Sequence, residues 1–522
     1  MPSFSPRCVL RRLSGGIALM LAGLASVSNP AWAQHVLTPA QAEHFARLSF
    51  PAYQAFLSMP ADAARPDDIQ RNAAWLEAAF QARGFRTQAL PNEGKPVVFA
   101  ELPAGKPGRK TVLFYMHFDA QPVTPSEWKT DPWTPTLRAR DATGQWQTLP
   151  WGTLSTGPID PEWRVFARAA ADDKGPIVMF LAAIDALKAA GQLPEVNIKL
   201  LLDSEEEKGS PRLHTVMAAH QVLLQSDGLI VYDGAMPANN KPGVSFGNRG
   251  SIQLDLTVFG PLSAQHSGHQ GNVIPNPALG LSQLLASMKD AEGRVVIPGF
   301  YDGVSISEAD RQLMAKTAPP AAALAKRLGL ARLTPFAANP LEAVQYPSLD
   351  ILGLSAGQVG AKAANAIPAT ATASLNIRTV PETPPARMLG LVRQHLVAQG
   401  VHLIEGETPT PEERSQFPQL ARLTMLAYPS TSTAARVAMD SPLARWVLQG
   451  VRAPSQTEPE KVRMIGSTLP MSGAVDVLKM AYVVVPLVNA DNNQHGADEN
   501  MRLGNYLEGV RTIAAMLTTP LP

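Results

Sequence analysis

Short apolar runs alternate with amphipathic stretches over the first half of the chain. The pattern predicts helices at Pro39–Met59, Asp67–Arg83, Gly175–Ala190 and Leu213–Leu224, and strands at Pro96–Leu102, Thr111–His117, Val196–Leu202 and Gly228–Tyr232. A loop rich in Trp, Pro and Gly is expected at Ser126–Asp160. Alternation of strands with helices predicts a mainly parallel sheet that is covered by helices.

The pattern changes after Arg249-Gly250. Ser251–Phe259 and Ala371–Thr379 alternate apolar with polar residues, as half-exposed antiparallel strands do, and a Pro- and Ala-rich stretch at 293–347 separates them. The first pattern then resumes with a helix and a strand, expected at Ser441–Val451 and Ala481–Pro486. The prediction is an α/β fold, with a mainly parallel-sheet domain and an inserted α+β domain. The expected boundaries are 1–33 for a signal peptide, 34–249 and 426–522 for the first domain, and 250–425 for the insertion.

The N-terminus has the three parts of a signal peptide. Basic residues from Arg7 to Arg12 precede an apolar run at 15–27, and Ala31-Trp32-Ala33 forms a small-residue cleavage site. An uncleaved membrane anchor is the alternative, and Arg11-Arg12 leaves a twin-arginine signal open. We therefore expect an exported protein, periplasmic or secreted.

Composition excludes several classes of function. The chain has 522 residues and a formal net charge of +1, so no charge excess indicates nucleic acid or an anionic membrane as a partner. No other apolar run is long enough to span a bilayer, so no membrane association is expected after cleavage. The sole cysteine is Cys8, which excludes disulfides, thiolate zinc ligands and a cysteine nucleophile from the mature chain.

Five polar clusters follow predicted strands or precede a predicted helix: His117-Phe118-Asp119, Asp172-Asp173-Lys174-Gly175, Glu205-Glu206-Glu207, Asp233 and His495. Singly, each has a structural explanation, such as a hydrogen-bonded histidine, a helix cap, a solvated acidic surface or a turn. Together they indicate a site, because open α/β sheets place ligands at the carboxyl ends of their strands. Imidazole and carboxylate ligands without sulfur suit zinc, manganese or cobalt.

In this order, the clusters resemble the motifs of the di-zinc metallopeptidase family of aminoacylases, glutamate carboxypeptidases and carnosine-type dipeptidases. Asp172-Asp173-Lys174-Gly175-Pro176, and Gln121-Pro122 after the first motif, are most similar to the dipeptidase branch. Glu206-Glu207-Lys208-Gly209-Ser210 matches the family's Glu-Glu-x-Gly-Ser. The resemblance covers nearly all of the chain after the signal peptide. It implies the family fold, a catalytic domain with an inserted lid and dimerisation domain.

The resemblance implies two zinc ions per chain, with manganese or cobalt as alternatives, held by His117, Asp172, Glu207, Asp233 and His495. Asp172 would bridge the two ions. Glu206 would be the general base that activates water, and Asp119 would orient the imidazole of His117. Because three glutamates are consecutive, a register with Glu205-Glu206 stays open.

The insertion carries further matches. His266, in His266-Ser267-Gly268-His269, matches a histidine that comes from the partner subunit and binds the substrate carbonyl, which implies a homodimer. Its alternative role is to cap a glycine-rich turn. Arg378 matches an arginine that binds the free carboxylate of the substrate, although an exposed strand arginine is the other interpretation. Gly466-Ser467 resembles a backbone segment near that carboxylate.

One segment departs from the family pattern. The chain has Ala167-Arg168-Ala169 where the family shows Gly-Arg-Gly, and the added β-carbons could crowd the loop before Asp172. The resulting hypothesis is metal-dependent amide hydrolysis of dipeptides or short peptides with a free C-terminal carboxylate. The alternatives are an N-acyl-amino-acid amidohydrolase on the same scaffold, and a degenerate member that binds peptides without cleaving them.

Overall fold

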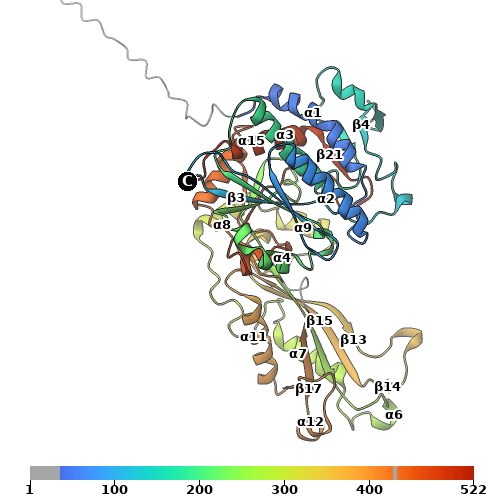
Figure 1. The fold of residues 1–522 in the computed structure, drawn as a ribbon. Helices are drawn as coiled ribbons and strands as arrows, with labels where there is room; N and C mark the ends of the chain where they lie inside the picture. Colours follow the sequence, from blue (N-terminus) through green and yellow to red (C-terminus); the bar gives the residue numbers. More distant parts are fainter. Residues whose placement is uncertain (1–35, 427–431) are drawn as a thin grey trace, which may run out of the picture. The chain divides into compact units, whose positions relative to one another are not determined.

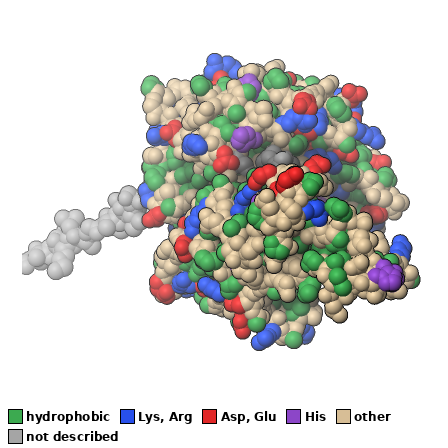
Figure 2. Space-filling model, turned by 90° about the horizontal axis from the view of Figure 1, so that it is seen from below, with side chains coloured by type: hydrophobic (Ala, Val, Ile, Leu, Met, Phe, Trp, Pro, Cys, Tyr) green, Lys and Arg blue, Asp and Glu red, His purple; other side chains and the backbone are tan. Residues whose placement is uncertain are grey.

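A computed structural model describes residues 36–426 and 432–522. The predicted signal peptide lies outside these residues. Within the described ranges, no helix combines the length and the apolarity that a membrane crossing requires. On the face drawn in Figure 2, acidic, basic and apolar side chains are interspersed, in keeping with the net charge of +1.

The largest sheet has the strand order β1-β2-β7-β3-β8-β20-β9-β19. Its strands are β1 Arg86–Leu90, β2 Val97–Leu102, β3 Thr111–His117, β7 Asn197–Asp203, β8 Gly228–Val231, β9 Gly243–Ser245, β19 Glu460–Val462 and β20 Val483–Val484. The central strands β7, β3, β8 and β20 are parallel. At one edge, β2 runs antiparallel to β7, and β1 runs antiparallel to β2. The prediction of an α/β fold is confirmed.

Helices cover both faces of this sheet (Figure 1). On one face, α1 and α15 pack against α3, and α13 packs against α15. Their bounds are α1 Pro39–Leu57, α2 Pro66–Gln81, α3 Lys174–Ala189, α13 Pro442–Arg452 and α15 Leu503–Leu517. The opposite face carries α4 Leu213–Ala219, α5 Gln221–Leu224 and α14 Ser472–Asp476. In β3, Val112 and Phe114 belong to the first core, and Leu113 and Tyr115 belong to the second.

Two expectations for this part of the chain are wrong in detail. The loop at Ser126–Asp160 contains β4 Thr136–Arg140 and β5 Trp146–Leu149, besides the 3-10 helices η2 Pro125–Glu127 and η3 Trp151–Ser155. These strands join β6 Arg164–Phe166 and β21 Asn500–Arg502 in an antiparallel sheet of order β21-β6-β4-β5. The helix expected at Leu213–Leu224 is divided between α4 and α5 at His220.

A five-stranded sheet lies between residues 250 and 425, with the order β13-β15-β11-β17-β16. Its strands are β11 Gly250–Phe259, β13 Ser348–Ser355, β15 Thr370–Thr379, β16 His402–Leu403 and β17 Leu420–Met425. Helices α7 Pro277–Met288 and α11 Pro385–Ala398 pack against β11 and β15 and enclose a core of their own (Figure 1).

Short elements complete the description. The Pro- and Ala-rich stretch contains α8 Glu308–Thr317, α9 Ala321–Arg327 and α10 Pro340–Ala343. The others are β10 Gly247–Asn248, β12 Gln265–His266, α6 Ser267–Gln270, η4 Glu206–Lys208, η5 Gly360–Lys362, β14 Ala366–Ile367, α12 Pro411–Gln416 and β18 Ala435–Arg436.

Candidate metal centre

His117 is the last residue of the buried central strand β3, and its side chain is fully enclosed. Its Nε2 lies 2.9 Å from Oδ1 of Asp172, and its Nδ1 lies 3.2 Å from the backbone oxygen of Asp119. The strand end therefore fixes the ring on both sides. Nδ1 faces a backbone oxygen, so Nε2, on the side of Asp172, is the nitrogen that could bind a metal ion.

Asp172 lies just before α3, in a segment that is packed tightly against its surroundings. A β-carbon at Gly175 would stand 2.3 Å from the oxygen of Ala170, so only glycine fits there. The buried Nζ of Lys174 donates to the oxygens of Phe56 and Met59, at 2.8 Å each. This contact places an N–H donor at the C-terminal end of α1, where carbonyl oxygens need partners. The start of α3, and Asp172 with it, is thus tied to the first helix.

Glu499 holds the segment before Asp172 from the other side. Its carboxylate is fully buried and accepts the backbone N–H groups of Ala169, Ala171 and Asp172 at 2.9–3.0 Å. It also accepts Nη1 of Arg168 at 2.8 Å. Pairing of β21 with β6 brings Glu499 to this loop from the far end of the chain. Four donors on one carboxylate make it the principal polar support of the Asp172 loop.

The alanines that depart from the family pattern fit into this loop. Ala169 is fully buried and has a φ of 63°, in the left-handed region that glycine adopts at no steric cost. An alanine there costs about 1–2 kcal/mol. The hydrogen bonds to Glu499 keep the loop in place despite this cost.

The turn after β7 presents the two glutamates of the third motif. Asp203 accepts the N–H groups of Ser204 and Glu205 at 2.7 and 3.2 Å, and the left-handed Gly209 closes the turn. Asp119 accepts the N–H groups of Glu206 and Glu207 at 2.9 and 3.1 Å. One oxygen of Asp119 also lies 3.4 Å from Nδ1 of His117. Asp119 therefore links the histidine to the glutamate turn.

The side chain of Glu205 points to a different set of partners. It is buried, forms an ion pair with Lys95, and accepts Nδ2 of Asn92 at 2.9 Å. Glu207 lies instead 3.3 Å from Nε2 of His495. This geometry supports the register in which Glu206 and Glu207 are the motif residues, and it disfavours Glu205-Glu206.

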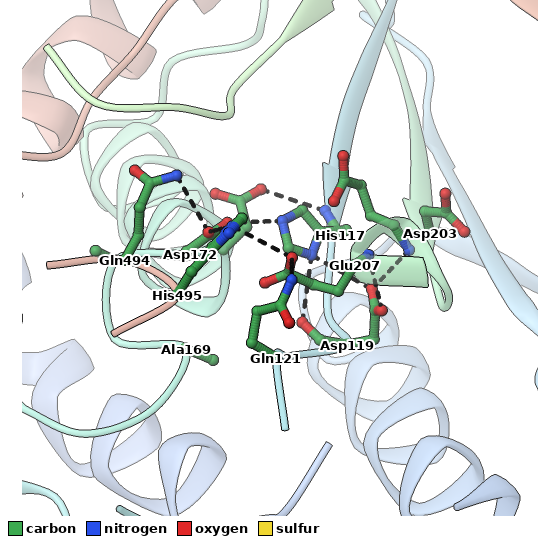
Figure 3. A network of polar contacts seen from close by, with 12 residues as sticks. His117, Asp119, Gln121, Ala169, Asp172, Asp203, Glu207, Gln494 and His495 are labelled. Atoms are coloured by element: carbon green, nitrogen blue, oxygen red, sulfur yellow. Dashed lines mark hydrogen bonds and ion pairs between the residues drawn. The ribbon is translucent and has the colours of Figure 1, made fainter. Parts of the chain in front are cut away.

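Two groups of possible ligands share Asp172. Figure 3 labels four of these ligands, His117, Asp172, Glu207 and His495. Ligand atoms of His117, Asp172 and Asp233 lie within 4.8 Å of one another, and so do those of Asp172, Glu207 and His495. Nε2 of His495 is 3.2 Å from Oδ2 of Asp172, while His117 faces Oδ1. The five residues that the sequence predicts as metal ligands are thus brought together, with one carboxylate oxygen of Asp172 directed to each side.

The charges of this cluster fit divalent cations. Burial, reinforced by the charge of Asp172, raises the pKa of Glu207 to about 7 and that of Asp233 to about 6. Burial also raises the pKa of Glu206 well above its ordinary value. Several carboxylates that disfavour one another's charge, beside two imidazoles, form a donor set that metal ions satisfy.

His266 lies at the junction of β12 and α6 and is exposed. Its Nδ1 accepts the N–H of Gly268 at 3.0 Å, and its ring is tilted by 38° against that of His269, with 4.6 Å between centroids. No hydrogen bond among the described residues joins it to the metal cluster. Within one chain, His266 therefore caps the glycine-rich turn, which is its alternative role, and its imidazole remains open to solvent.

Arg378, on β15, is brought to the segment that contains Gly466-Ser467. Its Nη1 donates to Oγ1 of Thr468 at 2.6 Å. The backbone oxygen of Ser467 accepts the N–H of Arg249 at 3.1 Å. The predicted carboxylate-binding residues thus lie together, and Thr468 joins them.

Comparison with known proteins identifies the family. The model of Peptidase family M20/M25/M40 matches residues 113–519. The chain belongs to this family. The predicted family and the prediction of a peptidase are confirmed, and the protein is a metal-dependent enzyme of the M20 type.

Relatives and solved structures of the M20 family agree with this assignment. The human Beta-Ala-His dipeptidase is 26% identical over 82% of this chain and 78% of its own. The Cys-Gly metallodipeptidase dug1 of Schizosaccharomyces pombe is 26% identical over 80% of this chain and 81% of its own. The M20 family metallo-carboxypeptidase Sso-CP2 from Sulfolobus solfataricus superposes with a TM-score of 0.69 at 26% identity, over 90% of this chain and 98% of its own.

Sequence patterns did not reveal several residues of the site. They are Glu499, Thr468, Gln121 and Gln494. Gln121 donates to Glu207 at 2.7 Å, and Gln494 lies 3.3 Å from Asp172 (Figure 3). Three of them stand close to a predicted motif: Gln121 follows His117-Phe118-Asp119, Gln494 precedes His495, and Thr468 follows Gly466-Ser467. Their proximity to a motif could have indicated these three residues, whereas no sequence motif lies next to Glu499.

Proposed function

We propose that the protein hydrolyses the amide bond of dipeptides or short peptides that carry a free C-terminal carboxylate. The observation that carries the proposal is the pair of ligand groups joined by Asp172, with Glu206 beside them. The dipeptidase names of the relatives at 26% identity support dipeptides as the substrate class.

The ligand groups define where two metal ions would bind. His117, Asp172 and Asp233 would hold one ion, and Asp172, Glu207 and His495 the other. Zinc is the proposed metal, and manganese or cobalt would suit the same donors. Ions bound there would polarise the scissile carbonyl and lower the pKa of water.

Glu206 is the proposed general base. Within the described part of the chain its carboxylate has no hydrogen-bond or ion-pair partner, while its N–H is fixed by Asp119. An unpaired carboxylate beside the ligands is able to take the proton of the attacking water and pass it to the leaving amine. Asp119 would position both the base and His117.

Arg378 is the proposed anchor for the substrate's terminal carboxylate. A guanidinium binds a carboxylate through two parallel hydrogen bonds, which fixes orientation as well as affinity. Thr468 and the backbone of Gly466-Ser467 would line the same subsite, next to Arg378.

We further propose a homodimer in which His266 of one copy completes the site of the other. β13 is an edge strand of the five-stranded sheet, and Ile351, Leu352 and Leu354 on it are 43%, 58% and 62% exposed. An open edge with apolar side chains favours pairing with a second chain. His266 would bind the substrate carbonyl oxygen.

Export is proposed from residues 7–33, on their basic, apolar and small-residue parts. N-terminal sequencing of protein recovered from outside the cytoplasm tests this. A first residue near Gln34 is expected, and an intact N-terminus at Met1 would contradict it.

The function is tested with protein reconstituted with zinc, on a panel of dipeptides and N-acyl amino acids, with and without a chelator. Release of free amino acids from dipeptides, abolished by the chelator and restored by zinc, is expected. Preference for N-acyl amino acids would favour the amidohydrolase alternative. Cleavage that the chelator leaves unchanged would contradict the metal-dependent mechanism.

A further inference from the structure

A cavity of about 690 Å³ lies under the Pro- and Ala-rich stretch, between this stretch and β13. Its walls include the aromatic rings of Tyr301 and Phe336, together with Val344. The two rings lie 5.6 Å apart and support each other. Ser348 of β13 and Arg249 also belong to the lining. The cavity is thus large enough for an amino-acid side chain and partly polar.

The cavity adjoins the subsite proposed for the substrate's carboxylate. Ser348 is the cross-strand partner of Arg378, so their side chains share one face of the sheet. The N–H of Arg249 donates to the oxygens of Ile465 and Ser467. A β-carbon at Gly466 would stand 3.4 Å from Val344, so this segment and the cavity wall are in contact. A substrate whose carboxylate reaches Arg378 would therefore meet the cavity next.

Arg249 has no ion-pair partner among the described residues, and its hydrogen bonds are incomplete. The residue is only 8% exposed, its Nη2 donates to the oxygen of Tyr346 at 2.7 Å, and its buried Nε has no hydrogen-bond partner among the described residues. Burial, followed by the charge of Arg378, lowers the pKa of Arg249 to about 10. Neither arginine has an ion-pair partner among the described residues, which contain all 44 Asp and Glu residues of the chain. The charge of Asp350 opposes this decrease in the pKa of Arg249 without forming an ion pair with it. Two adjacent guanidinium groups without a paired carboxylate are costly unless a ligand supplies the anion.

The remaining charges of the cavity favour the same sign of ligand. Lys289 and Arg332 contribute positive charge to the lining, and Asp350 is its acidic residue. Nζ of Lys289 lies 3.8 Å from Asp350, so that carboxylate is already balanced. The cavity therefore disfavours a cationic side chain and suits an acidic one.

We propose that this cavity receives the C-terminal residue of the substrate and that Arg249 binds the side-chain carboxylate of that residue. The substrates would be dipeptides, or acyl amino acids, that end in aspartate or glutamate. The proposal rests on the proposed function, because it places the terminal carboxylate at Arg378. It adds a second anion site that determines which C-terminal residue is preferred.

The test compares Ala-Glu with Ala-Gln and Ala-Asp with Ala-Asn, because each pair has nearly the same shape and differs in charge. We expect kcat/KM to be about ten- to a hundredfold higher for the acidic member, mainly through KM. Arg249→Gln should abolish this preference while retaining cleavage of Ala-Gln. Arg249→Lys, which keeps the charge, should retain part of the preference. Arg327→Gln removes an exposed arginine of the same stretch that does not line the cavity, and it should behave as wild type.

Product inhibition supplies a measurement that does not depend on turnover of the acidic substrates. Free L-glutamate should inhibit Ala-Gln cleavage about tenfold more strongly than L-glutamine does, and Arg249→Gln should remove this difference. Equal cleavage of acidic and amide substrates by the wild type would overturn the proposal. An Arg249→Gln variant whose kcat/KM falls by the same factor on all substrates would also overturn the proposal. Absence of cleavage of every dipeptide and acyl amino acid would instead overturn the proposed function.

Discussion

The metal-ligand cluster and the predicted substrate-binding residues are held in different ways. His117 and Asp172 are buried and are fixed by strand ends and by polar contacts from their own chain. His266 is exposed, and Thr468 is the one side-chain hydrogen-bond partner of Arg378 among residues 36–426 and 432–522. The metal side is thus prearranged within one chain, whereas the substrate side leaves donors for groups that come from outside.

The difference indicates where each type of residue acts. Ligands must be preorganised because a cluster of carboxylates repels itself until cations bind, so surrounding donors have to hold it together. Groups that bind substrate remain unpaired because the substrate is to be their partner. The predictions below test whether the two sides differ in this way.

Of the changes at His266, Glu499 and Ala169, removal of His266 is expected to have the largest effect. His266→Ala should lower kcat about a hundred- to a thousandfold, since a donor to the developing oxyanion is lost, while metal content is retained. Steady-state kinetics and metal analysis measure both quantities. His269→Ala, at the neighbouring exposed ring, is the matched control and should have little effect.

Mixing experiments then locate His266 in the dimer. A mixture of His266→Ala and Glu206→Gln proteins should regain up to about a quarter of wild-type activity, because each mixed dimer contains one complete site. No recovery after subunit exchange, or a strictly monomeric active protein, would contradict the role of the partner's histidine.

Weakening the support of Asp172 should have an intermediate effect. Glu499→Gln replaces a carboxylate that accepts four hydrogen bonds by an amide with one acceptor oxygen. We expect metal affinity to fall about ten- to a hundredfold, measured by competition with a chromophoric chelator. Glu508→Gln, which removes a carboxylate paired with Arg511 on α15, is the control. Lower thermal stability with unchanged metal affinity would show that Glu499 supports the fold alone.

The smallest effect is expected at Ala169. Ala169→Gly should stabilise the protein by up to about 1 kcal/mol, because relief of the left-handed conformation exceeds the added entropy of the unfolded chain. Denaturant unfolding measures the change. Ala170→Gly, in the same loop without a positive φ, should destabilise the protein by about 0.5–1 kcal/mol. Equal changes at both positions would remove the claim of local strain.

The sequence predicts the metal side better than the substrate side. β3 begins and ends at the residues that the apolar run predicts, and the ligands follow because strand ends locate them. The antiparallel sheet that contains β4, β5 and β6 could not be predicted in full, since β21, which pairs with β6, is distant in the chain. Glu499 was missed because three of its four donors are backbone N–H groups of a loop that is distant in the chain, and residue types do not indicate such contacts.

The central claim is that Glu206 acts as a base beside two metal ions without binding them. Glu206→Gln, prepared with zinc and compared with wild type for metal content and for kcat on the preferred dipeptide, tests it most directly. We expect about two zinc ions per chain in both proteins and a kcat lower by about a hundred- to ten-thousandfold. Near-normal turnover by the variant, or loss of metal together with activity, would contradict this assignment.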